Sequence, residues 1–178
     1  GTTNFAAGIP YWAISIARFV NGEPSEAFLD IPSLRQRIVA IKGQGAWRNQ
    51  KRLTPESRVA AGSSCVSLCS RSVRVLQKRP DQSFPGKIRL LGVASLNLVS
   101  VAMGQTAGAL EATPKIWDVA AAWLVLTELG CPLVWLGSHP AHLEPGRDLS
   151  EMGFPVVAAG SQKQLERLAP WGDLLLKR

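Results

Sequence analysis

Apolar and polar residues alternate along the first third of the chain, which is typical of β-strands that are buried on one face. Ile14 and Ile16 share one face of the first run, which ends at Asn21-Gly22, a dipeptide that strongly favours a two-residue hairpin. A further turn is expected at Asn49-Gln50. The predicted strands span residues 11–20, 27–31 and 35–42. The sequence therefore predicts that residues 1–57 form an antiparallel sheet.

Beyond residue 57, short apolar runs alternate with helical patterns. The strongest helical pattern covers residues 118–129, and Gly130 ends it. Further helices are predicted at 70–79, 95–103 and 161–168, and strands at 65–68, 87–91, 109–112, 132–136 and 155–159. Strands that alternate with helices after an antiparallel start favour a layered α/β fold. By length the chain is one domain or a large part of one, and residues 1–178 are expected to be the carboxyl-terminal portion of a single fold, with residues 58–178 as its mixed α/β part.

Composition narrows the class of protein. Hydrophobic residues make up 46% of the 178 residues, and no run of 18 apolar residues could span a membrane. The net charge of +7 comes from dispersed lysines and arginines without interleaved aromatic residues, so no nucleic-acid partner is expected. An acidic segment upstream of Gly1 would account for this imbalance. Three cysteines without zinc-ligand spacing are typical of reduced thiols, and a cytoplasmic location is expected.

One short segment, residues 1–3, and two acidic residues, Glu111 and Asp118, are candidates for binding or catalysis. Gly1, Thr2 and Thr3 would suit an anion site if they begin a helix, whereas taken alone they indicate a polar turn. Asp118 at the start of an apolar helix indicates a helix cap, but its carboxylate is also the kind of ligand that Mg²⁺ prefers. Glu111 alone indicates a surface carboxylate, although it could converge with Asp118 from a strand end and a helix start.

Other candidate sites are weaker. The G-x-G at residues 43–45 is followed by no helix, so a turn or bulge is expected there and not a phosphate loop. His139 and His142 have no acidic or thiol partner close in sequence, which favours a solvated loop. No G-x-S-x-G is present, and Gly1 cannot be the amino-terminal nucleophile of a self-processed hydrolase.

Four segments, taken in order, resemble motifs of the inositol monophosphatase family. They are 1–5 (G-T-T-N-F), 42–46 (K-G-Q-G-A), 89–97 (R-L-L-G-V-A-S-L-N) and 117–121 (W-D-V-A-A). The family's motifs are D-G-T-T-N-F, K-G-x-G-A, R-x-x-G-[ST]-A-A-x-[ND] and W-D-x-A-A-G. The resemblance covers almost the whole chain and begins inside the D-G-T-T-N motif. It implies the family's sugar phosphatase fold, in which helix and sheet layers alternate.

The resemblance also implies an activity and a role for particular residues. The activity is hydrolysis of inositol monophosphate, or a related small sugar phosphate, by water that magnesium ions activate. Gly1, Thr2 and Thr3 would bind the phosphate, and the Thr2 hydroxyl would help to activate the water. Asp118 would be catalytic as a magnesium ligand. With Glu111 and the Ala94 backbone, Asp118 would also contact the alcohol part of the substrate.

The chain departs from the family pattern in two ways. Val93 stands where the family has threonine or serine, and Ala122 replaces the last glycine of W-D-x-A-A-G. The family's other metal carboxylates, including the aspartate before G-T-T, have no counterpart, so this chain alone is expected to be inactive. An amino-terminal segment of the same protein would then be a partner, and a homodimer is expected because relatives commonly dimerise. The alternative is a non-catalytic family member that binds a ligand or another protein.

Overall fold

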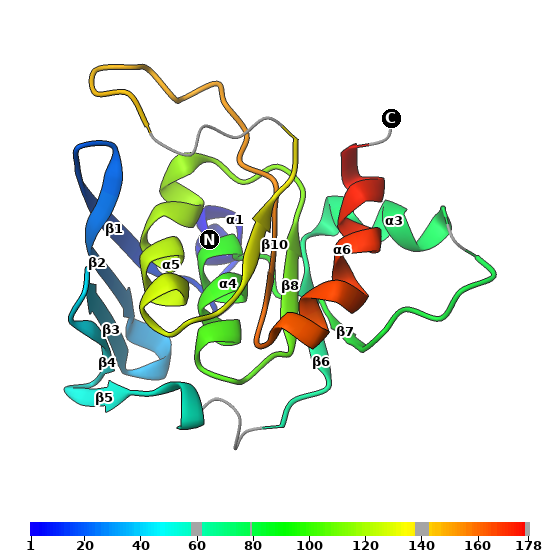
Figure 1. Ribbon diagram of the computed structural model, residues 1–178, viewed down its shortest axis with the longest axis horizontal. Coiled ribbons are helices and arrows are strands. Elements are labelled where there is room, and N and C mark those ends of the chain that lie inside the picture. The colour runs from blue at the N-terminus through cyan, green and yellow to red at the C-terminus, as the bar shows by residue number, and fades with distance from the viewer. Residues whose placement is uncertain (58–61, 79, 138–142, 177–178) are drawn as a thin grey trace.

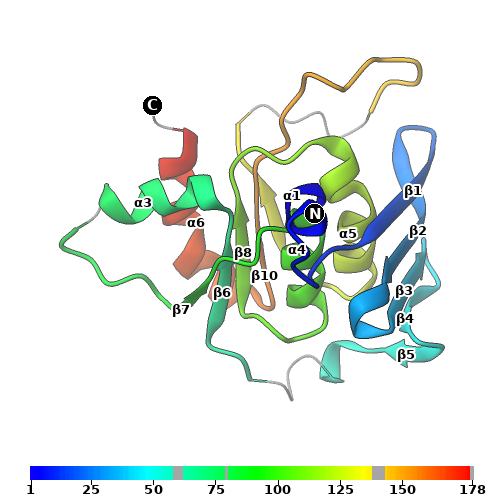
Figure 2. The same cartoon turned by 180° about the vertical axis from the view of Figure 1, so that it is seen from behind.

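The computed structural model describes residues 1–57, 62–78, 80–137 and 143–176, and it has the layered α/β architecture that the sequence predicts. Figure 1 shows four layers: an antiparallel sheet, the helices α4 and α5, a mixed sheet, and the helices α3 and α6. The two sheets have the strand orders β1-β2-β3-β4-β5 and β7-β6-β8-β10-β9. The short helix α1 (Thr2–Ala6) lies near α4 in both views (Figures 1 and 2).

The first sheet is an antiparallel meander, as predicted. Its strands are β1 (Ile14–Val20), β2 (Glu23–Ile31), β3 (Gln36–Ile41), β4 (Gly45–Arg48) and β5 (Lys51–Leu53), with a short 3₁₀ turn at Pro32–Leu34. The predicted turns at Asn21-Gly22 and Asn49-Gln50 are confirmed, and all four residues have positive φ. The first strand begins at Ile14, three residues later than predicted. The second begins four residues earlier than predicted, because the Asn21-Gly22 turn leaves only two residues between the strands.

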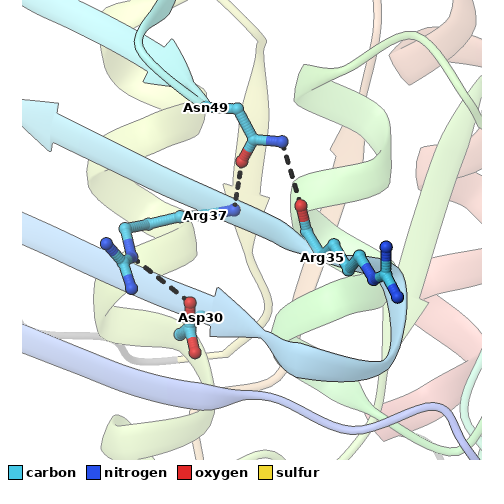
Figure 3. A network of polar contacts seen from close by, with 4 residues as sticks. All are labelled: Asp30, Arg35, Arg37 and Asn49. Carbon is cyan, nitrogen blue, oxygen red and sulfur yellow. Dashed lines mark hydrogen bonds and ion pairs between the residues drawn. The ribbon is translucent and has the colours of Figure 1, made fainter.

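Asn49 fixes the relative position of two neighbouring strands in this sheet. Its side-chain oxygen accepts a hydrogen bond from the Arg37 N–H at 2.8 Å, and its side-chain nitrogen donates to the Arg35 carbonyl at 3.0 Å. Arg37 also pairs with Asp30 on the adjacent strand at 3.3 Å (Figure 3). These side chains therefore reinforce the register that the backbone hydrogen bonds set.

The second sheet mixes parallel and antiparallel strands. Its members are β6 (Cys65–Leu68), β7 (Lys87–Arg89), β8 (Gly108–Glu111), β9 (Leu133–Trp135) and β10 (Val156–Ala159). The strand β6 runs parallel to β7 and β8, whereas β10 runs antiparallel to β8 and β9. All five lie within the predicted strand ranges or differ from them by one residue.

The helices follow the sequence pattern, with one correction. They are α4 (Ala94–Ala102), α5 (Ile116–Glu128), α6 (Gln162–Leu176) and a short run made of the 3₁₀ turn η2 (Ser70–Ser72) and α3 (Val73–Gln77). The prediction that the last helix ends at residue 168 is wrong, since α6 continues through Pro170. Burial of Trp171 and Leu174, which extend the apolar face of the helix, offsets the helix-breaking effect of the proline.

The main core lies between the two sheets and is filled by α4 and α5, and a second core lies between the mixed sheet and α6. The outer face of the first sheet is different. The register there aligns Ile16 with Phe28, Phe28 with Val39, and Val39 with Trp47, so apolar side chains form a row across four strands. Ile16 is 58% exposed, and Figure 1 shows no helix over this face within the described residues. We call these four residues the outer apolar row.

None of the helices in the described ranges combines the length and the apolar character that crossing a bilayer requires.

Candidate active site

The amino-terminal helix α1 is fastened to the turn that precedes α4. The Asn4 side-chain nitrogen donates to the Tyr11 carbonyl at 2.8 Å and to the Leu91 carbonyl at 2.9 Å. A Cβ at Gly1 would lie 3.1 Å from Val93 Cγ2 and 2.9 Å from Trp12 Cβ, so a side chain there has no room. The segments 1–5 and 89–97 therefore lie side by side, and the Gly1–Thr3 residues are adjacent to the start of α4.

Glu111 ends the buried strand β8 and is only 3% exposed, so the expectation of a surface carboxylate is wrong. Its Oε1 accepts a hydrogen bond from the Asn97 side-chain nitrogen at 2.7 Å. Burial raises the pKa of Glu111 to about 7, the nearby Asp118 charge adds to the increase, and the bond from Asn97 opposes it. Glu111 can therefore exchange a proton near neutral pH.

Asp118 lies in the first turn of α5 and is partly buried. Its Oδ2 accepts a hydrogen bond from the Lys115 N–H at 2.9 Å, so it caps the helix as the sequence pattern indicates. Its Oδ1 makes no hydrogen bond within the described part of the chain. Because the Asp118 charge acts on Glu111, the expected convergence of the two acids from a strand end and a helix start is confirmed.

The end of β8 is also held by the segment that follows β6. The Ser72 hydroxyl donates to the Leu110 carbonyl at 3.1 Å, and Cys69 Sγ accepts a hydrogen bond from the Ala112 N–H at 3.3 Å. Sequence reasoning missed this function of Cys69 and Ser72, and it assigned Asn97 no role. Only the place of Asn97 inside the 89–97 motif could have indicated its importance.

The structure places the predicted site residues in two groups. Gly1, Thr2 and Thr3 are exposed on α1 beside the residues that precede Ala94, the first residue of α4. Glu111 and Asp118 form the second group. Within the described residues no hydrogen bond joins the two groups, and their common use by one substrate remains a proposal.

Other candidate residues have structural roles or fall outside the description. The G-x-G at 43–45 forms a turn, as expected, and the Glu128 carboxylate accepts hydrogen bonds from the N–H groups of Gly43 and Gly45, both at 2.8 Å. His139 and His142 lie outside the described residues. All three cysteines are free thiols, and in the described ranges no three acidic, histidine or cysteine side chains gather as a metal would require.

Comparison with known proteins gives the same family as the motifs. The family model described as inositol monophosphatase family matches residues 1–170. A putative Nus factor SuhB from Neisseria meningitidis serogroup B is 30% identical over 155 residues, covering 82% of this chain and 59% of that protein. An inositol-1-monophosphatase from Rhizobium meliloti is 33% identical over 137 residues, covering 73% of this chain and 52% of that protein.

A solved structure confirms the fold. The extragenic suppressor protein SuhB from Bartonella henselae superposes with a TM-score of 0.74 at 26% identity, covering 99% of this chain and 67% of that one. The shared fold defines this chain as a layered α/β protein of the same architecture. The chain belongs to the inositol monophosphatase family. It spans between half and three-fifths of the length of the two curated relatives described above.

Proposed function

We propose that this chain carries the phosphate-binding and alcohol-binding residues of a magnesium-dependent phosphomonoesterase that acts on inositol monophosphate or a related small sugar phosphate. The observation that carries the proposal is the convergence of Glu111 and Asp118 at the junction of β8 and α5. Family membership and the activity in the name of the Rhizobium meliloti relative support it.

The proposed roles agree with the local structure. The helix α1 begins at Thr2, so the N–H groups of Thr2 and Thr3 have no acceptor within the helix and can donate to a phosphate. The Thr2 hydroxyl is exposed and would orient or activate the attacking water. Glu111 and the Ala94 backbone would hold the alcohol part, and Asp118 would contact both alcohol and metal.

Asp118 supplies one carboxylate ligand for a metal ion, and a single protein ligand is not sufficient to hold a catalytic magnesium ion. Magnesium prefers six oxygen ligands, several of them waters, and usually more than one comes from the protein or the substrate. The described residues do not gather three potential ligands, so this chain fits the metal only in part. When bound, magnesium would activate water and neutralise phosphate charge. We derive no step through it, because its other ligands must come from outside these residues.

An amino-terminal segment of the same protein is the proposed source of those ligands. The free edge of β1 and the outer apolar row form a surface that such a segment could cover. Next to this edge, Ile16 and Trp117 line a cavity of about 650 Å³, and Trp117 is 54% exposed. Burying such apolar area would favour association. A homodimer of the assembled protein remains part of the proposal.

Phosphate release tests the proposed activity. The chain should be co-expressed with the segment that precedes it in the gene, and inorganic phosphate should be measured with inositol 1-phosphate and magnesium. We expect turnover from the assembled protein and none from this chain alone. Asp118→Asn should lower the rate at least a hundredfold, because a neutral amide is a weak magnesium ligand. Glu166→Gln, at an exposed position of α6, is the control and should leave the rate unchanged.

A non-catalytic role is the second candidate. Val93 is 2% exposed beside Gly1 and places an apolar side chain where the family pattern has a hydroxyl, and Ala122 is fully buried in α5. Absence of turnover on any sugar phosphate by the assembled protein, together with retained binding, would favour this role.

A further inference from the structure

Cys69 is hydrogen-bonded to the backbone on both sides of Glu111. The Cys69 N–H donates to the Leu110 carbonyl at 3.2 Å, and Cys69 Sγ accepts from the Ala112 N–H at 3.3 Å. Leu110 and Ala112 are the residues immediately before and after Glu111. One residue, through its main chain and its thiol, therefore restrains both peptide groups that carry the Glu111 side chain.

These bonds lie at the place where the strand pairing ends. The parallel pairing of β6 with β8, which lie side by side in Figure 2, ends at Leu68 and Leu110, so Glu111 extends one residue beyond it. On the opposite side of β8, Val156 of β10 still pairs with Glu111. The contacts of Cys69 therefore replace strand pairing on the β6 side of the last residue of β8.

The thiol also acts on the Glu111 carboxyl group itself. Burial is the main cause that raises the pKa of Glu111, whereas side-chain hydrogen bonds from Asn97 and Cys69 lower it. Asn97 comes from α4 and Cys69 from the segment after β6, so two different elements hold the carboxyl group. Ser72 Oγ lies 2.9 Å from Cys69 Sγ, and this contact limits the directions in which the thiol can point.

We propose that Cys69 is a positioning residue for the Glu111 carboxylate and thereby sets the affinity of the site for the hydroxyl groups of the substrate. This inference rests on the proposed function, in which Glu111 contacts the alcohol part. A carboxylate that the protein already holds in place loses little conformational freedom when it accepts a hydrogen bond from a substrate hydroxyl group. Without the thiol, the substrate itself would have to order the end of β8, and it would bind more weakly.

The side-chain amide of Asn97 reports the position of Glu111 in this 178-residue chain, because it donates to Glu111 Oε1 at 2.7 Å. In NMR spectra of Cys69→Ala, the signals of this amide should shift, and its protons should exchange with water about tenfold faster. Cys69→Ser should restore part of the protection, since a hydroxyl oxygen can also accept from the Ala112 N–H. Cys65→Ser is the matched control, because it changes a thiol of β6 that forms no side-chain hydrogen bond with a described residue.

Kinetics of the assembled protein, made by co-expression with the preceding segment, test the consequence for binding. Inositol 1-phosphate presents ring hydroxyl groups to Glu111, whereas phenyl phosphate has none. Cys69→Ala should raise KM for inositol 1-phosphate about tenfold and leave kcat within about twofold, because the weakened contact is the same in the ground state and the transition state. The constants for phenyl phosphate should stay unchanged, whereas a general loss of folded protein would affect both substrates alike.

The outcomes are distinct. If the Asn97 side-chain signals are the same in Cys69→Ala and the wild type, Cys69 does not position Glu111 and the inference is overturned. It is also overturned if these signals change but KM rises for neither substrate, or rises equally for both. If the signals change and the assembled wild type hydrolyses neither substrate, the proposed function fails together with the role in alcohol binding, while the positioning of Glu111 by Cys69 is supported.

Discussion

Asn97 donates its side-chain amide to Glu111 at 2.7 Å in the interior of the protein, at the boundary between α4 and β8. Asn97 is fully buried and Glu111 is 3% exposed. A buried carboxylate is stable only when its charge is compensated or when it is protonated. Asn97 supplies one hydrogen bond, and burial together with the Asp118 charge keeps the pKa of Glu111 at about 7.

Glu111 should make the stability of this chain depend on pH. Its pKa is about 7 in the folded state and about 4.5 in the unfolded state, so the folded state holds the proton more tightly. The contribution of Glu111 to the free energy of unfolding is therefore fully present below pH 4.5. It falls as the pH rises and is lost above pH 7.

Glu111→Gln should abolish this loss, because the amide is neutral and its oxygen can still accept from Asn97. We expect the variant to equal the wild type at pH 4 and to exceed it by about 3 kcal/mol at pH 8. Urea unfolding at several pH values measures the difference. A difference that does not change with pH would contradict the assigned pKa.

Asn97→Ala should raise the pKa of Glu111 further, because it removes the hydrogen bond that stabilises the charged form. At pH 8 the variant should also lose about 1–3 kcal/mol of stability, since a buried acceptor is left without its donor. Titration of the Glu111 carboxyl carbon by NMR measures the first effect. Ser67→Ala is the control, because the Ser67 hydroxyl is buried and has no hydrogen-bond partner among the described residues, so its removal should not shift that pKa.

Much of the fold could be predicted from local patterns, because turns and apolar periodicity are local properties. Asn21-Gly22 indicated the first hairpin, and the apolar face of residues 118–129 indicated α5. The extent of α6 could not be predicted in the same way. Pro170 indicates a helix end locally, and only the packing of Trp171 in the second core explains why the helix continues.

The candidate site could be predicted only in part, because local sequence patterns do not determine which distant residues surround a side chain. The positions of Asp118 and Glu111 in the sequence indicated a helix start and a strand end, which allowed the two acids to converge, and the family resemblance implied their common role. The burial of Glu111 depends on Asn97 and on the segment after β6, which lie far away in sequence. The raised pKa therefore follows from tertiary structure and not from any local pattern.

Glu128 joins the helix layer to the first sheet, and this contact should contribute measurably to stability. Its carboxylate receives two backbone hydrogen bonds, from Gly43 and Gly45. Glu128→Ala should cost about 2 kcal/mol, since it leaves both N–H groups without their charged acceptor. It should also speed hydrogen exchange at these two glycines. Glu26→Ala removes an exposed partner of Arg18 and should cost less than about 1 kcal/mol. If the two variants lose the same free energy of unfolding, the Glu128 contact contributes no more to stability than an exposed ion pair.

Gly92 and Gly8 form a matched pair for testing how α1 is attached. Both have left-handed backbone conformations, with φ of +76° and +71°, so alanine at either position should cost about 1–2 kcal/mol. At Gly8 no atom of the described residues lies within 4 Å of the added Cβ, whereas at Gly92 the added Cβ would lie 3.1 Å from Asn4 Oδ1. Gly92→Ala should therefore displace the Asn4 side chain and break its hydrogen bonds to Tyr11 and Leu91.

The difference between the two variants isolates the Asn4 contact. We expect Gly92→Ala to cost about 2 kcal/mol more than Gly8→Ala in urea unfolding, because each of the two Asn4 hydrogen bonds contributes about 1 kcal/mol. The Phe5 amide, which bonds to the Gly1 carbonyl inside α1, should also exchange faster in Gly92→Ala than in Gly8→Ala. If the two variants unfold alike and protect Phe5 alike, then Asn4 does not hold α1 against the turn before α4. The position of Thr2 and Thr3 beside Ala94 would then require another explanation.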